Sequence, residues 1–308
     1  MAAFLKCIQP RALWVMETEL WPNWLAACEA RHLPVTIINA RLSERSCQRY
    51  ARFQGAFDTL SRPLTHLLCQ HQDDADRFAR LGIGRGRLAV TGSIKFDIQL
   101  GDEVQAKGHA LRLALGVDRP VWIAASTHQG EDEQVLAAFD SVLQRHPLAL
   151  LILVPRHPER FDRVAELCAP YGCVRRTGDA PIRETDKVYL GDTMGELPLM
   201  LAAADVAFVG GSLVKVGGHN LLEPAALGKP CLSGPAYFNF SDITRQLVAQ
   251  GGAALVMDAA ALGNKVSELL ADEGERRQMG EQARAVVLRN QGALARTLSH
   301  CLASLEND

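Results

Sequence analysis

The sequence predicts an α/β protein with parallel sheets, because apolar segments of strand length alternate with helical patterns along almost the whole chain. With 308 residues, 48% of them hydrophobic, the chain is long enough for two domains with cores of their own. A polar stretch at residues 99–108 separates the pattern into two series, and we expect the junction between the domains there.

The first series predicts an N-terminal domain over residues 1–98. Its strands are expected at 12–16, 35–39, 65–69 and 88–91, with helices near 22–31, 44–60 and 73–81. Nucleotide-binding halves of this kind usually open on a glycine-rich turn after the first strand, and no such turn precedes Trp14. We therefore expect this domain to be incomplete, without its front part.

The second series predicts a complete doubly wound domain over residues 99–290. Its strands are expected at 121–125, 149–154, 173–175, 187–190, 206–209, 230–232 and 253–256. Two helices with polar faces are expected from about residue 260 onward. Residues 291–308 are assigned to a separate C-terminal helix.

The composition argues against several classes of protein. The net charge of −2 gives no electrostatic reason to expect nucleic acid as a partner. The eight cysteines contain no C-x-x-C pair, which favours free thiols in a reducing cytoplasm over a zinc site. No apolar run approaches the ~18 residues of a membrane span, and the N-terminus lacks the apolar core of a secretory signal. These features predict a soluble cytoplasmic chain.

Several catalytic motifs are absent from the sequence. It contains no G-x-x-x-x-G-K-[ST], no G-x-S-x-G, no H-E-x-x-H and no D-x-D pair suited to a metal-dependent transferase. ATPase, serine hydrolase and metalloprotease functions therefore lose their support. We expect no metal and no cofactor.

The most informative segment begins with the glycine turn Gly210-Gly211-Ser212 and continues through residues 218–224. It has the pattern of a strand end, a glycine turn and a helix start. Such a turn lets a ligand approach the backbone, and the helix N-terminus offers N–H groups to a phosphate. Glu223, one turn into the helix, can accept hydrogen bonds from sugar hydroxyls. The segment suits a nucleotide-sugar donor, and equally a turn that binds nothing.

Other predicted strands of this domain also end in polar residues. Ligands of open α/β sheets bind at such strand ends. Arg156 either binds a phosphate or pairs with Glu159, and the neighbouring His157 is expected to be structural. The turn at 191–197 either receives a base or ribose or simply caps a helix. Ser126 and Thr127 are candidates for phosphate ligands or helix caps.

The first domain offers two candidate charged groups. Glu17 and Glu19 follow a strand and are expected on one face, either to stabilise positive charge or to favour a helix start. Lys95 either faces an anionic donor or pairs with Asp97.

Two further groups of residues are candidates for binding a second substrate that accepts the sugar. Arg41, Arg45 and Arg49 form one stripe if their segment is helical. That stripe either faces solvent or meets a phosphorylated acceptor or an anionic membrane. Trp21 and Trp24 are expected in the core, with an apolar patch for a lipid acceptor as the alternative.

Together these segments resemble the 3-deoxy-D-manno-octulosonic acid (Kdo) transferase family, in family order over essentially the whole chain. The matching motifs are METELWPN at 16–23, NARLSERS at 39–46, GSIKFD at 92–97, STHQGE at 126–131, PRHPERF at 155–161, GDTMGEL at 191–197, FVGGSLV followed by GGHNLLEPA from 208, and GP–FNF at 234–240.

This resemblance implies a GT-B glycosyltransferase with two Rossmann-like domains, the N-terminal one incomplete in this chain. It implies metal-free transfer of Kdo from CMP-Kdo to the lipid A precursor of lipopolysaccharide, at the cytoplasmic face of the inner membrane. By resemblance, three turns bind the CMP part of the donor. Their residues are Pro155, Arg156, Met194, Gly195, Glu196, Asn220, Leu221, Leu222 and Glu223.

The resemblance also assigns catalytic roles. Glu17 and Lys95 match family positions that stabilise the transition state, while an acceptor hydroxyl attacks the anomeric carbon and a carboxylate acts as general base. In the family the base and a hydrophobic membrane anchor precede METELWPN, and neither Glu17 nor Glu19 matches the base. We therefore expect a soluble or peripheral donor-binding chain with little or no transferase activity unless the missing segment is supplied.

Two other functions stay open. Another GT-B protein, such as a UDP-sugar transferase or 2-epimerase, would prefer UDP to CMP. A non-catalytic subunit of a membrane enzyme would bind CMP without turnover even with the upstream segment restored.

Overall fold

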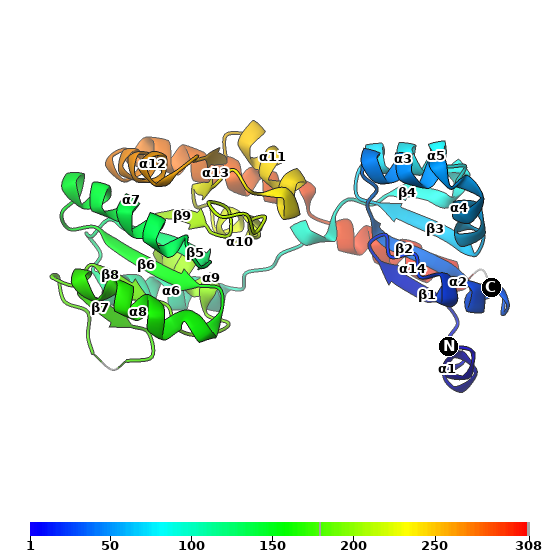
Figure 1. The fold of residues 1–308 in the computed structure, drawn as a ribbon, viewed down its shortest axis with the longest axis horizontal. Coiled ribbons are helices and arrows are strands. Elements are labelled where there is room, and N and C mark those ends of the chain that lie inside the picture. The colour runs from blue at the N-terminus through cyan, green and yellow to red at the C-terminus, as the bar shows by residue number, and fades with distance from the viewer. Residues whose placement is uncertain (179, 307–308) are drawn as a thin grey trace. The chain divides into compact units, whose positions relative to one another are not determined.

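The structure, a computed structural model, describes residues 1–178 and 180–306 and divides the chain into two compact units (Figure 1). Unit 1 contains Met1–Asp97 and the residues from Asn290 onward, and unit 2 contains Ile98–Arg289. Unit 1 is therefore built from both ends of the chain.

Unit 1 holds a four-stranded parallel sheet in the order β1-β2-β3-β4. The strands are β1 (Leu13–Met16), β2 (Val35–Ala40), β3 (Leu64–Cys69) and β4 (Leu88–Val90). The helices are α1 (Ala2–Ile8), α2 (Pro22–Glu29), α3 (Glu44–Arg52), α4 (Gln54–Ser61), α5 (Gln72–Arg80) and α14 (Ala293–Glu306), with 3₁₀ turns η1 (Arg85–Arg87) and η2 (Ile94–Phe96). All four strands predicted for the first domain are present.

The single helix predicted over 44–60 is wrong, because the chain breaks at Phe53. Phe53 leaves the helical region (φ −121°, ψ 45°), ending α3 and opening α4. The second helix can then turn Phe57 into the core, where its ring lies 5.2 Å from that of Tyr50 and is only 1% exposed. Burial of one aromatic side chain contributes about 1.5–3 kcal/mol, which favours the break over a continuous helix.

The last helix, which the sequence pattern sets apart as residues 291–308, packs within unit 1. Asp97 accepts hydrogen bonds from the backbone N–H groups of Gly292 and Leu294, both at 2.6 Å. Arg296 donates from Nε to the carbonyl oxygen of Thr91 at 2.9 Å. Asp97 thus caps α14 and is not the partner of Lys95.

Unit 2 holds a seven-stranded parallel sheet in the order β11-β10-β9-β5-β6-β8-β7. The strands are β5 (Val121–Thr127), β6 (Leu150–Pro155), β7 (Cys173–Arg175), β8 (Val188–Leu190), β9 (Val206–Val209), β10 (Cys231–Ser233) and β11 (Ala253–Leu255). The helices are α6 (Asp102–Leu115), α7 (Asp132–Arg145), α8 (Phe161–Cys168), α9 (Leu197–Ala203), α10 (Leu222–Ala226), α11 (Ser241–Ala249), α12 (Ala259–Ala271) and α13 (Glu273–Asn290), with 3₁₀ turns η3 (Pro158–Arg160), η4 (Ala169–Tyr171) and η5 (Phe238–Phe240).

The sheet of unit 2 is covered on both faces, so its central strands are mostly apolar. Alternate residues of β5 point to opposite layers. Trp122 and Ala124 pack with α7, α8 and α12, whereas Val121 and Ile123 pack with α6 and α9. This two-sided burial explains why the seven strands of this unit are readable from the sequence as apolar runs.

The structure adds detail to two predictions about this part of the chain. Among the described residues after 258 lie α12, α13 and α14, and α12 and α13 are separate helices because Asp272 leaves the helical region and its carboxylate accepts from the N–H of Glu275 at 2.8 Å. The junction expected within 99–108 lies beside the division of the units between Asp97 and Ile98, and α6 begins within that stretch at Asp102.

Candidate donor-binding site

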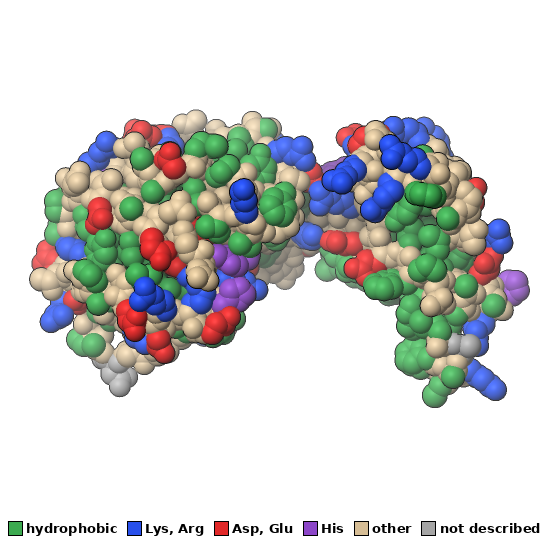
Figure 2. Space-filling model, viewed as in Figure 1, with side chains coloured by type: hydrophobic (Ala, Val, Ile, Leu, Met, Phe, Trp, Pro, Cys, Tyr) green, Lys and Arg blue, Asp and Glu red, His purple; other side chains and the backbone are tan. Residues whose placement is uncertain are grey.

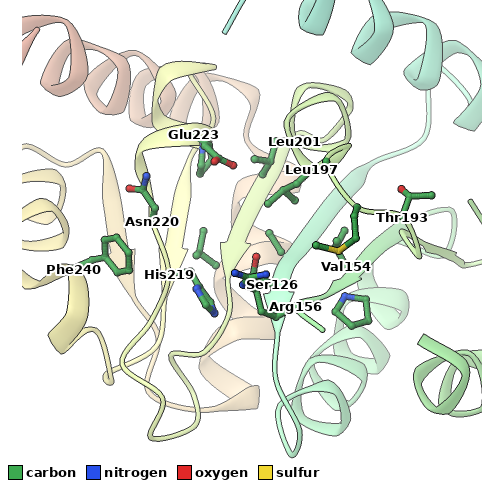
Figure 3. A pocket seen from close by; sticks show the side chains of 16 residues that line it. Ser126, Val154, Arg156, Thr193, Leu197, Leu201, His219, Asn220, Glu223 and Phe240 are labelled. Atoms are coloured by element: carbon green, nitrogen blue, oxygen red, sulfur yellow. The ribbon is translucent and has the colours of Figure 1, made fainter. Parts of the chain in front are cut away.

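The strand order of unit 2 places a crevice at its centre. β5 pairs with β6 on one side and with β9 on the other, so the order of connection reverses between β5 and β9. Ligands of open α/β sheets bind outside the carboxyl ends of the strands at such a point. A cavity of about 260 Å³ lies there (Figure 3). Its lining residues are Ala125, Ser126, Val154, Pro155, Arg156, Thr193, Met194, Gly195, Leu197, Leu201, Val209, His219, Asn220, Glu223, Pro224 and Phe240.

Three turns that are distant in sequence meet in this cavity. Six of the nine residues expected to bind CMP line it, namely Pro155, Arg156, Met194, Gly195, Asn220 and Glu223. Leu221 and Leu222 are 1% and 0% exposed, so their side chains belong to the core. The Asn220 side chain accepts a hydrogen bond from the N–H of Leu222 at 3.1 Å and fixes the start of α10.

Glu196 does not line the cavity, because its carboxylate is held by other side chains. Arg176 donates to it twice, at 2.8 and 3.1 Å, and the Thr193 hydroxyl donates at 2.6 Å. The Arg176 guanidinium lowers the pKa of Glu196 to about 2. Glu196 therefore shapes the turn that carries Met194 and Gly195.

Glu223 is the carboxylate that faces the cavity. It is half-buried, and burial raises its pKa above the usual range. Within residues 1–178 and 180–306 its side chain has neither a hydrogen-bond nor an ion-pair partner. A half-buried acceptor without a partner is ready to bind a hydroxyl group of a ligand.

Arg156 and Ser126 lie at the opposite end of the cavity from Glu223 in Figure 3. The backbone N–H of Arg156 donates to the carbonyl oxygen of Thr127 at 3.0 Å, while its side chain is exposed. In the described part of the chain it makes no ion pair with Glu159. The Arg156 guanidinium is thus available to an anion, as the sequence predicts in one of its two readings.

Ser126 reaches the cavity because β5 bulges there. The pairing of β5 with β6 shifts register between Ala125 and Thr127, and Ser126 has φ +58°. Thr127, by contrast, is fully buried and donates to the Asp132 carboxylate at 2.7 Å. Of the two candidate hydroxyl groups, only that of Ser126 lines the cavity.

The glycine turn at 210–212 differs from expectation, because its amides bind a side chain of the protein. The carboxylate of Glu131, fully buried at the start of α7, accepts from the N–H groups of Gly211 at 2.6 Å, Ser212 at 3.0 Å and Leu213 at 2.9 Å. A Cβ on Gly210 would lie 2.7 Å from that carboxylate. The glycines therefore make room for Glu131 and not for a ligand phosphate. The only sign of this role in the sequence is that the motif STHQGE at 126–131 ends on Glu131.

Glu17 and Lys95 meet within unit 1. Lys95 Nζ lies 2.9 Å from Glu17 Oε1, although the residues are far apart in sequence. Glu17 lies just beyond β1 with φ +57°, a conformation that costs about 1–3 kcal/mol and is common at functional sites. Glu19 instead accepts a hydrogen bond from Trp21 Nε1 at 3.0 Å.

Unit 1 also has an apolar groove of about 360 Å³ beside this ion pair. It is lined by Leu13, Trp14, Val15, Met16, Glu17, Glu19, Trp21, Trp24 and Leu25. Trp21 is 59% exposed, so the expectation that it lies in the core is wrong, whereas Trp24 is half-buried and packs edge-on against Phe4.

The predicted arginine stripe is shorter than expected. α3 begins at Glu44, so Arg41 precedes it and only Arg45 and Arg49 share the helix. Both are exposed, as is Arg52 in the last turn, and Figure 2 shows basic side chains gathered over the α3 side of this unit.

In the described residues no group of three or more His, Cys, Asp or Glu side chains is arranged to hold a metal ion. Among the described helices, none has the length and apolar character that crossing a membrane requires.

Comparison with known proteins identifies the family. A family model described as 3-deoxy-D-manno-octulosonic-acid transferase matches residues 1–98, and the model for glycosyl transferases group 1 matches residues 175–286. A 3-deoxy-D-manno-octulosonic acid transferase from Haemophilus influenzae is 43% identical over 298 residues, which cover 96% of this chain and 70% of that protein. The chain belongs to the 3-deoxy-D-manno-octulosonic acid transferase family. The corresponding protein from Bordetella pertussis is 39% identical, with coverage of 96% and 69%.

Solved structures agree with this family assignment. The C-terminal CMP-Kdo binding domain of WaaA from Acinetobacter baumannii is 36% identical, with a TM-score of 0.58, and covers 61% of this chain and 99% of that domain. Anabaena HepE in complex with UDP has a TM-score of 0.61 and covers 98% of this chain and 82% of its own, at 15% identity. The second likeness shows a shared fold alone. The predicted family, glycosyltransferase class and GT-B fold are thus confirmed.

Proposed function

We propose that this chain binds CMP-Kdo in the cavity of unit 2 and transfers Kdo to the lipid A precursor of lipopolysaccharide. The observation that carries the proposal is the pairing, in one cavity, of the Arg156 guanidinium at one end with the half-buried Glu223 carboxylate at the other, neither of which has an ion-pair partner among the described residues. A nucleotide offers the complementary groups, an anionic phosphate and the hydroxyl groups of a ribose.

The phosphate, ribose and base of the donor each contact a different part of the cavity. Arg156 and Ser126 bind the phosphate, and Glu223 accepts hydrogen bonds from the ribose hydroxyls. The base lies against Leu197, Leu201 and the turn with Met194 and Gly195. The 36% identity to a domain described as CMP-Kdo binding supports cytidine as the base.

The proposed transfer is a direct displacement at the anomeric carbon of the donor. An acceptor hydroxyl oxygen attacks the anomeric carbon, the bond from that carbon to the phosphate oxygen breaks, and its electron pair leaves with CMP. The hydroxyl proton passes to a general base. Glu17 and Lys95 stabilise charge in the transition state. We propose no metal and no cofactor.

The surface of unit 1 suits an amphiphilic acceptor. Its apolar groove can hold acyl chains, while Arg45, Arg49 and Arg52 on α3 can contact phosphates or an anionic membrane surface. We propose that the chain works at the cytoplasmic face of the inner membrane on this basis.

The test is calorimetric titration of the 308-residue chain with CMP and with UMP. CMP should bind more tightly than UMP, and Glu223→Ala should weaken CMP binding about 10- to 150-fold, because a hydrogen bond to a charged group contributes about 1.5–3 kcal/mol. Glu159→Ala is the matched control, since it removes an exposed carboxylate near Arg156 that does not line the cavity.

Equal affinity of wild type and Glu223→Ala for CMP would contradict the assigned site, and preference for UMP would favour a UDP-sugar enzyme. In a transfer assay with CMP-Kdo, run with the upstream segment that the resemblance requires for activity supplied, Glu17→Gln and Lys95→Ala should lower the rate. The same variants should leave CMP affinity unchanged, because the ion pair belongs to unit 1.

A further inference from the structure

Three histidines gather at the phosphate end of the cavity. His128 follows β5, His157 follows β6, and His219 precedes α10 in the segment after β9. The rings of His128 and His219 are stacked, with centroids 5.0 Å apart and an interplanar angle of 9°. His157 meets His128 edge-on at 5.2 Å. His219 itself lines the cavity.

His128 and His219 share a hydrogen bond between their two Nε2 atoms, at 2.7 Å. One Nε2 must donate and the other accept, so this bond forms when the two atoms hold a single proton between them. Neighbouring groups hold the two rings in this position. Gly211 lies beneath it at φ +69°, where a Cβ would come within 3.1 Å of the His219 ring, and the His128 N–H donates to Glu131 at 3.2 Å.

The charges that face the pair are mostly positive. Burial first, then His128, Arg156 and His157, lower the pKa of His219 to about 4. Burial also lowers the pKa of His128, as do His157, Arg160 and Arg156, against the opposing charge of Glu131.

The acids nearby are already engaged. The Glu131 carboxylate accepts from four backbone N–H groups, and Asp132 pairs with Arg160 and Thr127. Burial and the neighbouring positive charges therefore both favour the neutral form of the two imidazoles, which lie close to Arg156.

We propose that the His128–His219 pair takes up a proton when a nucleotide phosphate enters the cavity, and binds that phosphate as a shared cation beside Arg156. This inference rests on the proposed donor site. A nearby anion favours the charged form of a histidine. The added proton also leaves the bond between the rings intact, because the protonated His219 can donate from Nδ1 while its Nε2 remains paired.

The proton uptake has a consequence for the reaction. When the bond between the anomeric carbon and the phosphate oxygen breaks, its electron pair stays on that oxygen and the negative charge of CMP increases. A cation already in place stabilises this leaving group without any proton transfer during the step. The pair is thus a positioning and binding element for the departing phosphate.

The test is titration of the full chain with CMP at pH 7.5 in two buffers of different ionisation enthalpy, which counts the protons taken up. We expect a net proton uptake on CMP binding that grows as pH falls, and CMP affinity that rises as pH falls from 8.5 to 7, because an anion beside the pair raises the pKa of its histidines. Cytidine, which lacks the phosphate, should bind without proton uptake.

His128→Gln and His219→Gln should still bind CMP through Arg156 but lose the uptake and the slope with pH. His146→Gln is the control, since that ring contacts the Ser267 carbonyl oxygen and does not line the cavity. CMP binding by the wild type without proton uptake, or uptake that persists in both variants, overturns this inference alone. Absence of CMP binding to the folded wild type overturns the donor site together with it.

Discussion

Replacement of Glu131 by Gln should destabilise unit 2 although Glu131 does not line the cavity. Its Oε2 accepts from the N–H groups of His128 at 3.2 Å and Gly211 at 2.6 Å, and its Oε1 from those of Ser212 at 3.0 Å and Leu213 at 2.9 Å. Gln keeps one oxygen, so in either orientation its amide NH₂ faces two backbone donors. Each buried donor left without an acceptor costs about 1–3 kcal/mol, so we expect the free energy of unfolding to fall by about 2–6 kcal/mol.

Urea unfolding can isolate this effect. Trp122 is a fully buried tryptophan of unit 2, and the other three tryptophans of the chain lie in unit 1, so replacing those three by Phe makes fluorescence report on unit 2. Glu133→Gln, at an exposed position of the same helix, is the control and should change stability by less than about 0.5 kcal/mol. If Glu131→Gln and Glu133→Gln have the same urea midpoint, the buried carboxylate does not hold the glycine turn.

Two further predictions concern packing and pH. Gly280→Ala should lower the free energy of unfolding by about 1–3 kcal/mol, because the new Cβ would lie 2.0 Å from the Gly228 carbonyl oxygen, whereas Gly274→Ala in the same helix should be neutral or stabilising by urea unfolding. The Glu196–Arg176 pair lowers the pKa of Glu196 from 4.5 to about 2, so its stabilisation is complete above pH 4.5 and is lost as pH falls toward 2. The difference in urea midpoint between wild type and Glu196→Gln should therefore shrink between about pH 5 and pH 3, and a constant difference would refute this assignment.

Much of the site was predictable from the sequence because parallel strands buried on both faces are apolar runs, and their ends can be located. Three groups of cavity residues come after such strand ends in the sequence: Arg156, the turn with Met194 and Gly195, and Glu223. Since the carboxyl ends of parallel strands meet at one edge, these residues had to converge.

Other features depended on side chains that meet only after folding. The spacing of Glu131 from Gly211 is 80 residues, and no periodic pattern links a carboxylate to the amides of a distant turn. The same holds for the bond between His128 and His219, which forms because β5 and β9 become neighbours in the sheet. Glu196 was misjudged for this reason, since its partner Arg176 lies on another segment.

The sequence by itself determined the family, the two parallel sheets and the turns that form the cavity of unit 2, because local periodicity and motifs carry that information. Only the tertiary structure decided which charges stay free for a ligand. A carboxylate or an amide is available only if no distant partner satisfies it, and folding brings Glu131 to the glycine turn and Asp97 to α14 while Glu223 keeps no partner among the described residues. Hydrogen bonding of buried polar groups is a property of the packed molecule, since every donor and acceptor removed from water must find its partner in three dimensions.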